Sequence, residues 1–315
     1  MNQTRPIKVR MEQIRQACRI HGGTFNMLGA AIGVRLSRVP IPTAALRRKV
    51  FHMIYGAKYG ALDEAELERP LEDYRSINAL FTRGVRPELR PVPNRLDQFL
   101  SPVDGKVQDI GRIQDDTVMT IKGVRYTLDS LCPETNTVPF RDGHFAILFL
   151  SPRDCHRVFT PAAGTLEKMV HVPGNRLLVH PPYQTPEFPV FSLNERLVME
   201  LDTSLGKCLL IMVAGWGVGH ITHPFRVSPR FSPRRVSATT LEPPRAMGRA
   251  EWIATFELGS TVILITAKGS ATQPLCEPEQ SVRFGEPLFD TTSSSAAEGR
   301  FYSSENWQGK LAGEI

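Results

Sequence analysis

The pattern of apolar and polar positions divides the chain into two parts. Up to about residue 90, apolar side chains recur at helical spacing within Arg10–Ile20, Ala44–Tyr59 and Ala61–Phe81, and Pro and Gly signals separate these segments. From about Asp97 onward, short apolar runs alternate with turn residues, as in HFAILFLSPRD and RLVMELDTSLGKCLLIMVAGWGVG. The pattern therefore predicts an α+β fold, in which a helical N-terminal region precedes a mostly antiparallel, β-rich body.

One strand-like stretch, EWIATFELGSTVILITAKG, is interrupted by Gly259 and Ser260. Apolar and polar residues alternate before the interruption, and the apolar run Val262–Ile265 follows it, so both sides are predicted strands. An interior glycine weakens a strand and marks a bulge, a bend or a close backbone approach. Taken alone, this pair is interpreted as a bulge followed by a solvated serine.

Two Pro-rich stretches, Val172–Pro189 and Ser228–Arg245, are predicted loops long enough to cover a site. The end of the chain, from residue 292, is rich in serine and poor in apolar residues. This composition predicts a loose tail.

Composition narrows the class of protein. The 315 residues, of which 41% are hydrophobic and 22% charged, are typical of a globular chain with a substantial core. A net charge of +6 permits anionic partners such as nucleic acid or acidic lipid surfaces. The five cysteines lie far apart and lack the ligand spacing of a zinc site, so we expect reduced thiols and no metal.

The N-terminal region combines apolar and basic residues. The run Met27–Val34 is followed by several arginines and a lysine, and no stretch of the chain is apolar for the length of a membrane span. Such a segment suits a helix that lies in a membrane interface, and it equally suits a helix packed on its own core. We expect residues 1–90 to form a helical, membrane-associating region, residues 91–291 the β-rich body and residues 292–315 the tail.

Each polar landmark is a weak signal by itself. Asp104, in SPVDGKV, belongs to an Asp-Gly pair that is typical of a hairpin turn. His156 follows a strand that Ser151-Pro152 is expected to end, where a histidine is commonly a structural hydrogen bonder. His220 and His223 have the spacing of metal ligands, but no third ligand stands near them in the sequence.

Taken together, the segments SPVDGKV, FLSPRDCHRV, VPGNRLLVH, NERLVMEL and ELGSTV, in this order, resemble the phosphatidylserine decarboxylase family of pyruvoyl enzymes. INALFTRGVRPELRPV, residues 77–92, resembles the family's region before its first catalytic segment. ELGSTV is the most specific element, because it matches the Leu-Gly-Ser-Thr motif at which the family cuts its own chain.

The resemblance implies that the Ser260 hydroxyl attacks the Gly259 carbonyl, so that the chain splits into a β chain, residues 1–259, and an α chain, residues 260–315. Ser260 would become a pyruvoyl group, the cofactor that forms a Schiff base with the substrate amine and takes up electrons during decarboxylation. By the same resemblance, His156 handles substrate and proton transfer, and Asp104 belongs to the self-cleavage relay. Glycine suits position 259 because it lets a nucleophile approach its carbonyl.

The chain departs from the family at one position. Many members carry HxxH in this segment, whereas CHRVF places Phe159 where the second histidine, usually the relay histidine, would stand. General acid–base catalysis contributes about 10²–10⁴-fold to a rate. Our hypothesis is that self-cleavage survives with His156, or another histidine such as His180, serving Asp104.

The implied function is decarboxylation of phosphatidylserine to phosphatidylethanolamine at an anionic membrane surface, peripherally on the cytoplasmic face of the cell membrane. The α and β chains of one precursor are the implied partners, a homodimer is left open, and we expect no nucleic-acid partner. The alternatives are a pyruvoyl decarboxylase of a soluble amino acid, a non-cleaving lipid-binding homologue, and a lipoyl- or biotinyl-type carrier. The carrier lacks a lysine at a suitable hairpin tip.

Overall fold

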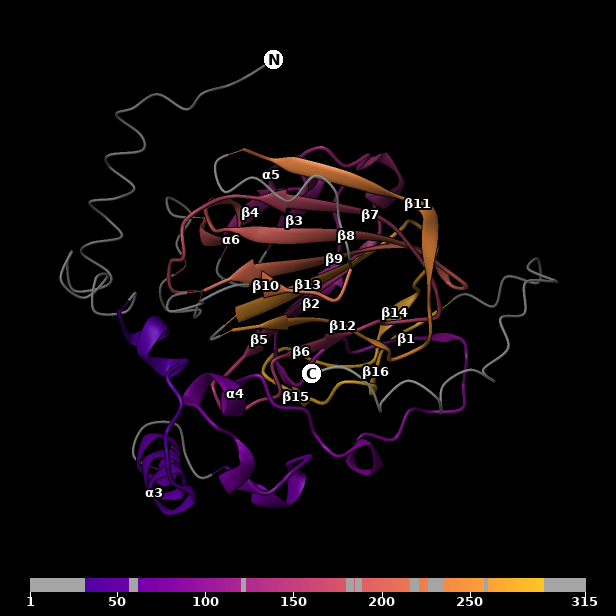
Figure 1. Cartoon of the computed structure of the whole chain (residues 1–315). Coiled ribbons are helices and arrows are strands. Elements are labelled where there is room, and N and C mark those ends of the chain that lie inside the picture. The colour runs from indigo at the N-terminus through magenta and orange to yellow at the C-terminus, as the bar shows by residue number, and fades with distance from the viewer. Residues whose placement is uncertain are drawn as a thin grey trace.

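A computed structural model describes residues 32–56, 62–119, 123–179, 184, 189–215, 221–225, 235–257 and 260–291. Its largest element is an eight-stranded sheet in which every neighbouring pair is antiparallel (Figure 1). The strands, in spatial order, are β11 (Ser237–Met247), β7 (Gly164–Val172), β8 (Arg196–Thr203), β9 (Gly206–Ala214), β13 (Ser260–Thr266), β5 (His144–Leu150), β2 (Gly105–Arg112) and β15 (Ser281–Val282). The prediction of a mostly antiparallel, β-rich body is confirmed.

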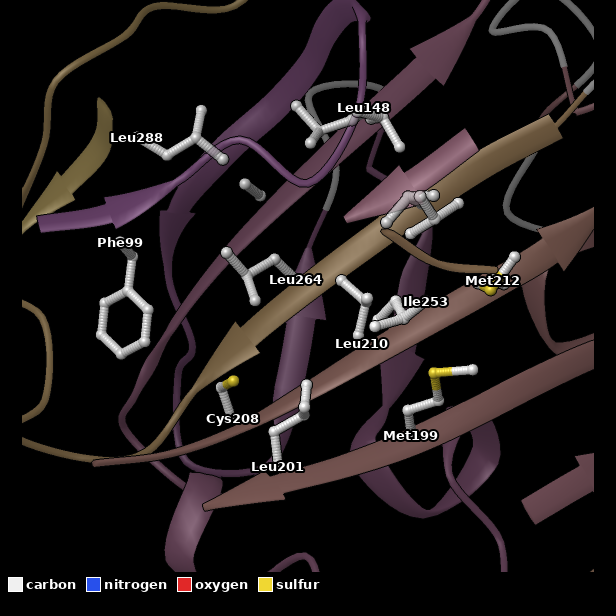
Figure 2. Packing of buried hydrophobic residues seen from close by; sticks show 14 of the residues in the cluster. Phe99, Leu148, Met199, Leu201, Cys208, Leu210, Met212, Ile253, Leu264 and Leu288 are labelled. Atoms are coloured by element: carbon white, nitrogen blue, oxygen red, sulfur yellow. The ribbon is translucent and has the colours of Figure 1, made fainter. Parts of the chain in front are cut away.

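The central strands are apolar on both faces because both faces of the sheet are covered. Successive side chains of a strand point to opposite faces. Along β13, Val262 and Leu264 therefore join one buried cluster, while Ile263 and Ile265 join another. Figure 2 shows the first cluster, in which Leu264 lies beside Leu210. Full burial of such a side chain stabilises the fold by about 1.5–3 kcal/mol, so a charged residue at Ile263 would disrupt the centre of the sheet.

Smaller elements cover the two faces. A second sheet, with the order β10 (Ile221–Thr222), β12 (Trp252–Phe256) and β6 (Arg157–Phe159), contributes Val158, Ile253, Ala254 and Phe256 to the first cluster. The opposite face is covered by the hairpin β3 (Thr117–Met119) and β4 (Arg125–Thr127) and by the short helices α5 (Leu128–Leu131) and α6 (Val190–Leu193). A third sheet has the order β1 (Gln98–Leu100), β16 (Pro287–Asp290) and β14 (Gln273–Pro274).

The N-terminal region is only partly helical. Helix α3 (Ala44–Ile54) forms within the predicted segment Ala44–Tyr59, and the side chain of Thr43 caps it by accepting a hydrogen bond from the Leu46 N–H. The predicted helical segment Ala61–Phe81 is wrong as a continuous helix: its described residues form η2 (Glu64–Glu66), η3 (Leu71–Asp73), α4 (Ile77–Phe81) and extended links. Pro70 causes the break, because proline removes a helical hydrogen bond and disfavours helical backbone before it. The predicted helix Arg10–Ile20 lies outside the described residues.

One predicted loop is a strand. Residues 237–245 of the Pro-rich stretch Ser228–Arg245 belong to β11, at the edge of the large sheet. Its pairing with β7 shifts register between Thr240 and Arg245, and Pro243 and Pro244 fall inside this interruption. Proline cannot donate to a ladder, and an edge strand with a bulge is where a sheet accepts it. The loop prediction failed because it treated the two prolines as excluding a strand altogether.

Among the described residues, no helix has both the length and the apolar character needed to cross a membrane.

Candidate active site

At Gly259 and Ser260 the chain passes from one sheet to another. Strand β12 ends at Phe256 in the three-stranded sheet, and β13 begins at Ser260 in the eight-stranded sheet. The backbone of Ser260 is paired with Leu150 on one side and with Ala214 on the other. Both flanking stretches are strands, as predicted, and they belong to two different sheets. Gly259 and the side chain of Ser260 lie outside the described part of the structure.

A second connection joins the same two sheets in the opposite direction. Residues 151–156 lead from β5, the partner of β13, to β6, the partner of β12. The backbone N–H of Phe256, at the end of β12, donates to the carbonyl oxygen of His156 at 3.0 Å. The pairing of the flanking strands therefore brings His156 to the edge at which the chain passes from Phe256 to Ser260.

The connection is held by a tight turn. The Ser151 N–H donates to Oδ2 of Asp154 at 2.6 Å, and the Asp154 N–H donates to the Ser151 carbonyl at 2.9 Å. Ser151-Pro152 ends the strand as predicted, and a turn follows it. Burial raises the pKa of the Asp154 carboxyl, while its hydrogen bonds from Ser151 oppose this effect.

His156 is fully buried, with 0% of its surface exposed. Its Nδ1 lies 2.9 Å from the carbonyl oxygen of Asp154, and its ring packs on Phe81 with ring centroids 3.9 Å apart. Because a carbonyl can only accept, Nδ1 carries the proton and Nε2 carries a lone pair. Nε2 is buried and has no hydrogen-bond partner within the described residues.

The electrostatic environment keeps this imidazole neutral. Burial, followed by the positive charge of Arg83, lowers the pKa of His156 to about 3. At neutral pH the side chain can accept a proton or a hydrogen bond at Nε2, and it does not carry a charge. Nε2 is therefore available as an acceptor, while a pKa this low makes the imidazole a weak base.

Asp104 occupies a different environment. Arg90 contacts both carboxylate oxygens, with Nε 3.1 Å from Oδ1 and Nη2 2.6 Å from Oδ2, and the Phe284 N–H donates to Oδ1 at 2.9 Å. The ion pair is buried, with the Arg90 side chain 2% exposed. Arg90 also contacts Glu66 at 3.0 Å. Burial by itself would lower the pKa of Arg90, but the hydrogen bonds that Arg90 donates to Asp104 and Glu66 outweigh this effect, and the pKa is raised.

The structure does not join Asp104 to His156 by a hydrogen bond, and none of the hydrogen bonds to Asp104 within the described residues comes from an imidazole. Its negative charge nonetheless reaches the neighbouring residue: burial, followed by the charge of Asp104, raises the pKa of the Cys155 thiol to about 12. Asp104 therefore lies close to the connection that carries His156 while bonding to Arg90 and Phe284.

The interpretation of Asp104-Gly105 as a hairpin turn is wrong. Gly105 is the first residue of β2, whose partners are β5 and β15 and not the preceding strand β1. A Cβ at position 105 would lie 2.5 Å from the carbonyl oxygen of Phe149. The glycine is needed for close backbone approach to β5, which brings Asp104 beside the site.

Phe159 packs where the resemblance places a second histidine. Its ring stacks on that of Phe284, with centroids 3.7 Å apart and an angle of 12° between the planes. Together with Cys155 and Val85 the two rings form a small apolar cluster. The same Phe284 donates its N–H to Asp104, so the stack lies directly beside the Asp104–Arg90 ion pair.

Sequence reasoning missed Arg90 and Phe284. Arg90 lies in the segment INALFTRGVRPELRPV, whose resemblance to the family could have marked it as a site residue. Phe284 is 180 residues from Asp104, and no feature of the sequence links the two. His180 and His220 lie outside the described residues, and His223 is stacked on Phe225 with centroids 5.7 Å apart. Within the described part of the chain, no three His, Cys, Asp or Glu side chains are grouped to hold a metal ion.

Comparisons with known proteins identify the family of this chain. A family model described as phosphatidylserine decarboxylase matches residues 77–290. The chain is 36% identical over 255 residues to the phosphatidylserine decarboxylase proenzyme of Nitrosococcus oceani, which covers 77% of this chain and 80% of that protein. It is 34% identical over 272 residues to the proenzyme of the same name from Anaeromyxobacter sp., which covers 84% of this chain and 93% of that protein. This chain belongs to the phosphatidylserine decarboxylase family, and the resemblance drawn from its sequence is confirmed.

Proposed function

We propose that this chain cuts itself between Gly259 and Ser260, and that it then decarboxylates phosphatidylserine to phosphatidylethanolamine with a pyruvoyl group derived from Ser260. Membership of the family supports the reaction. The observation that carries the self-cleavage is the buried Nε2 of His156, which lacks a partner within the described residues and lies at the edge where the chain passes from β12 to β13.

In the proposed self-cleavage, the Ser260 hydroxyl attacks the Gly259 carbonyl and converts the amide into an ester. Removal of the Ser260 α-proton then expels the Gly259 carboxylate and leaves a dehydroalanine. Addition of water releases ammonia and leaves a ketone at the new N-terminus. Removal of the hydroxyl proton and of the α-proton each needs a base, and the unprotonated Nε2 of His156 can accept a proton.

The residues around position 260 also fit a carbonyl cofactor. Such a ketone supplies the electron sink that no ordinary side chain offers to a decarboxylation. Residue 260 begins a strand paired on both sides, so the new N-terminus would stay fixed after the cut. His156 would hold or move a proton at Nε2, and the apolar ring of Phe81 against the imidazole would exclude water from that side.

The two chains would remain one folded unit after cleavage. Strand β13, in the α chain, is paired along its length with β5 and β9 of the β chain. The α chain also supplies β15 to β2 and β16 to β1. Separation would expose the centre of the largest sheet and the buried clusters on both of its faces.

The proposed location is the cytoplasmic face of the cell membrane, with the protein bound peripherally. The substrate is a lipid, and the described N-terminal residues combine exposed large apolar side chains with basic ones. Leu36, Val39 and Met53 are 61%, 54% and 62% exposed, and Arg35, Arg47, Arg48 and Lys49 stand among them. Each basic residue near an anionic surface adds about 1 kcal/mol of attraction.

Intact mass spectrometry of the purified protein tests the proposal. We expect two fragments, residues 1–259 and residues 260–315, the smaller one with a pyruvoyl mass at its N-terminus, and a single full-length species for Ser260→Ala. The rate of carbon dioxide release is then measured with phosphatidylserine vesicles and, separately, with free serine. Release from the vesicles alone supports the lipid as substrate, and release from free serine supports a soluble amino acid. If the wild-type protein stays full length, the non-cleaving lipid-binding reading replaces this one.

A further inference from the structure

A long-range ion pair connects the N-terminal region to the connection that is proposed to be cut. Nη2 of Arg38 donates to Oε2 of Glu257, a residue 219 positions away in the sequence. Glu257 follows directly after the last residue of β12 and stands two positions before Gly259. Figure 1 shows the indigo N-terminal segment beside the edge of the body at which β12 ends.

Arg38 itself is held by local structure. Residues 32–37 are helical, and the end of this helix is closed by hydrogen bonds from the Arg38 N–H to the Arg35 carbonyl and from the Val39 N–H to the Leu36 carbonyl. The neighbouring Arg48 and Arg47 contact Glu64 and Glu72, which belong to the same N-terminal region. The Arg38–Glu257 pair differs from them because it reaches the strand-bearing body.

We infer that Arg38 is a positioning residue for self-cleavage, an inference that rests on the proposed cut at Gly259–Ser260. Residues 257–259 span the gap between two strands whose ends are fixed by their sheets. Attack by a neighbouring hydroxyl is fast only when the reacting atoms are held near their reacting geometry. The ion pair with Arg38 anchors the Glu257 side chain, two positions before Gly259 in the sequence.

The charge of Arg38 has a second effect. Negative charge develops on the Gly259 carbonyl oxygen during attack and on the Gly259 carboxylate when it leaves. The Glu257 carboxylate, which is 17% exposed, would oppose both if it stood unpaired. The guanidinium of Arg38 neutralises it. Loss of Arg38 therefore removes this anchor and leaves the Glu257 carboxylate without the neutralising guanidinium.

The test measures how fast the full-length protein converts to two chains. The protein is labelled during cell-free translation, further labelling is stopped, and the first-order rate of conversion is followed over time. The variants are Arg38→Gln, Arg38→Glu, Arg38→Lys and the charge exchange Arg38→Glu with Glu257→Arg. Arg48→Gln is the matched control, because Arg48 makes exposed ion pairs in the same region with Glu64 and Glu72, away from the connection.

We expect Arg38→Gln to slow conversion about two- to fivefold, as suits a partly exposed ion pair, and Arg38→Glu to slow it further because it adds repulsion. Arg38→Lys and the charge exchange should recover most of the rate, and Arg48→Gln should match the wild type. Equal rates for Arg38→Glu and the wild type, or a loss that the charge exchange does not restore, overturn the inference. If the wild-type protein itself does not convert, the proposed function has failed instead.

Discussion

The Nδ1 of His156 lies 2.9 Å from the carbonyl oxygen of Asp154, and this single contact determines which ring nitrogen is available for chemistry. It holds the proton on Nδ1 and leaves the lone pair on Nε2, within a fully buried side chain. In a relay, a carboxylate would perform this orienting role. Here a backbone carbonyl performs it, and the carbonyl is itself positioned by the Ser151–Asp154 turn.

The first prediction concerns the pH dependence of stability. Burial lowers the pKa of His156 to about 3, whereas a histidine in an unfolded chain titrates near 6.5. Between these values the unfolded state binds more protons, so the free energy of unfolding falls by up to about 1.4 kcal/mol per unit as pH is lowered. The contribution is complete above about pH 6.5 and is lost as pH falls towards the folded-state pKa.

Urea unfolding of the Ser260→Ala protein at several pH values, with and without His156→Gln, measures this term while keeping all samples full length. We expect the glutamine variant to lose less stability on going from about pH 6 to about pH 4 than its parent does. Parallel pH profiles for the two proteins would show that the imidazole gains its proton in the folded state.

The second prediction concerns Asp154. Asp154→Ala removes the acceptor of the Ser151 N–H, which costs about 1–3 kcal/mol for a buried donor left unpaired. It also loosens the carbonyl that orients His156, so the self-cleavage rate should fall. Asp154→Asn keeps an acceptor oxygen in the same place. Since the amide oxygen can still accept from the Ser151 N–H, this variant should retain the wild-type rate to within about twofold.

Time courses of chain conversion for both Asp154 variants, beside unfolding curves in the Ser260→Ala background, check this expectation. A slow asparagine variant with normal stability would contradict it, because the charge of Asp154 would then be needed and not its hydrogen bond.

The third prediction concerns the buried ion pair. Asp104→Asn leaves the guanidinium of Arg90 buried with Glu66 as its remaining acidic contact. Removing one partner of a buried pair typically costs about 3–5 kcal/mol, because a charge is left without compensation. We expect a loss of this order in urea unfolding. The matched control is Asp97→Asn, since Asp97 pairs with Arg95 at the surface, and it should leave the unfolding curve unchanged. If the urea unfolding curves of the two variants were similar, the Asp104–Arg90 pair would not stabilise the fold.

Much of the fold could be predicted from the sequence because local patterns decide it. The apolar runs of β5, β9 and β13 predict strands, and the helical spacing of apolar residues in α3 predicts a helix. The failures have local causes too. Pro70 breaks the expected helix Ala61–Phe81, and β11 carries two prolines that only an irregular edge strand accepts.

The sequence predicted which residues belong to the candidate site, but it did not predict which of them contact one another. The motif segments pointed to Ser260, Asp104 and His156. The partners of Asp104 lie 14 and 180 residues away, and Arg38 lies 219 residues from Glu257. Such pairs depend on how sheets and connections bring distant segments together, and a linear pattern does not encode that. Among the described residues, the carboxylate of Asp104 contacts Arg90 and the Phe284 N–H, and His156 makes no hydrogen bond to it. His180, the other histidine expected to serve Asp104, lies outside the described residues.

The last prediction follows from that arrangement and concerns Phe159. A histidine at position 159 would gain the value of general acid–base catalysis, about 10²–10⁴-fold, only if an acceptor orients its ring and the ring reaches the reacting serine. Both oxygens of Asp104 are already engaged by Arg90, and Oδ1 also accepts the Phe284 N–H. A polar ring at position 159 would also enter the apolar cluster of Cys155, Val85 and Phe284. Burying it there without a partner costs about 1–3 kcal/mol.

We therefore expect Phe159→His to lower the free energy of unfolding while leaving the self-cleavage rate within about threefold of the wild type, far below the gain of general acid–base catalysis. Phe159→Leu, which keeps the position apolar, is the control and should be the more stable of the two variants. The measurements are a cleavage time course and urea unfolding in the Ser260→Ala background. Acceleration by tenfold or more would mean that Asp104 exchanges Arg90 for an imidazole, so that the replacement of the second histidine, and not the ion pair, limits cleavage in this chain.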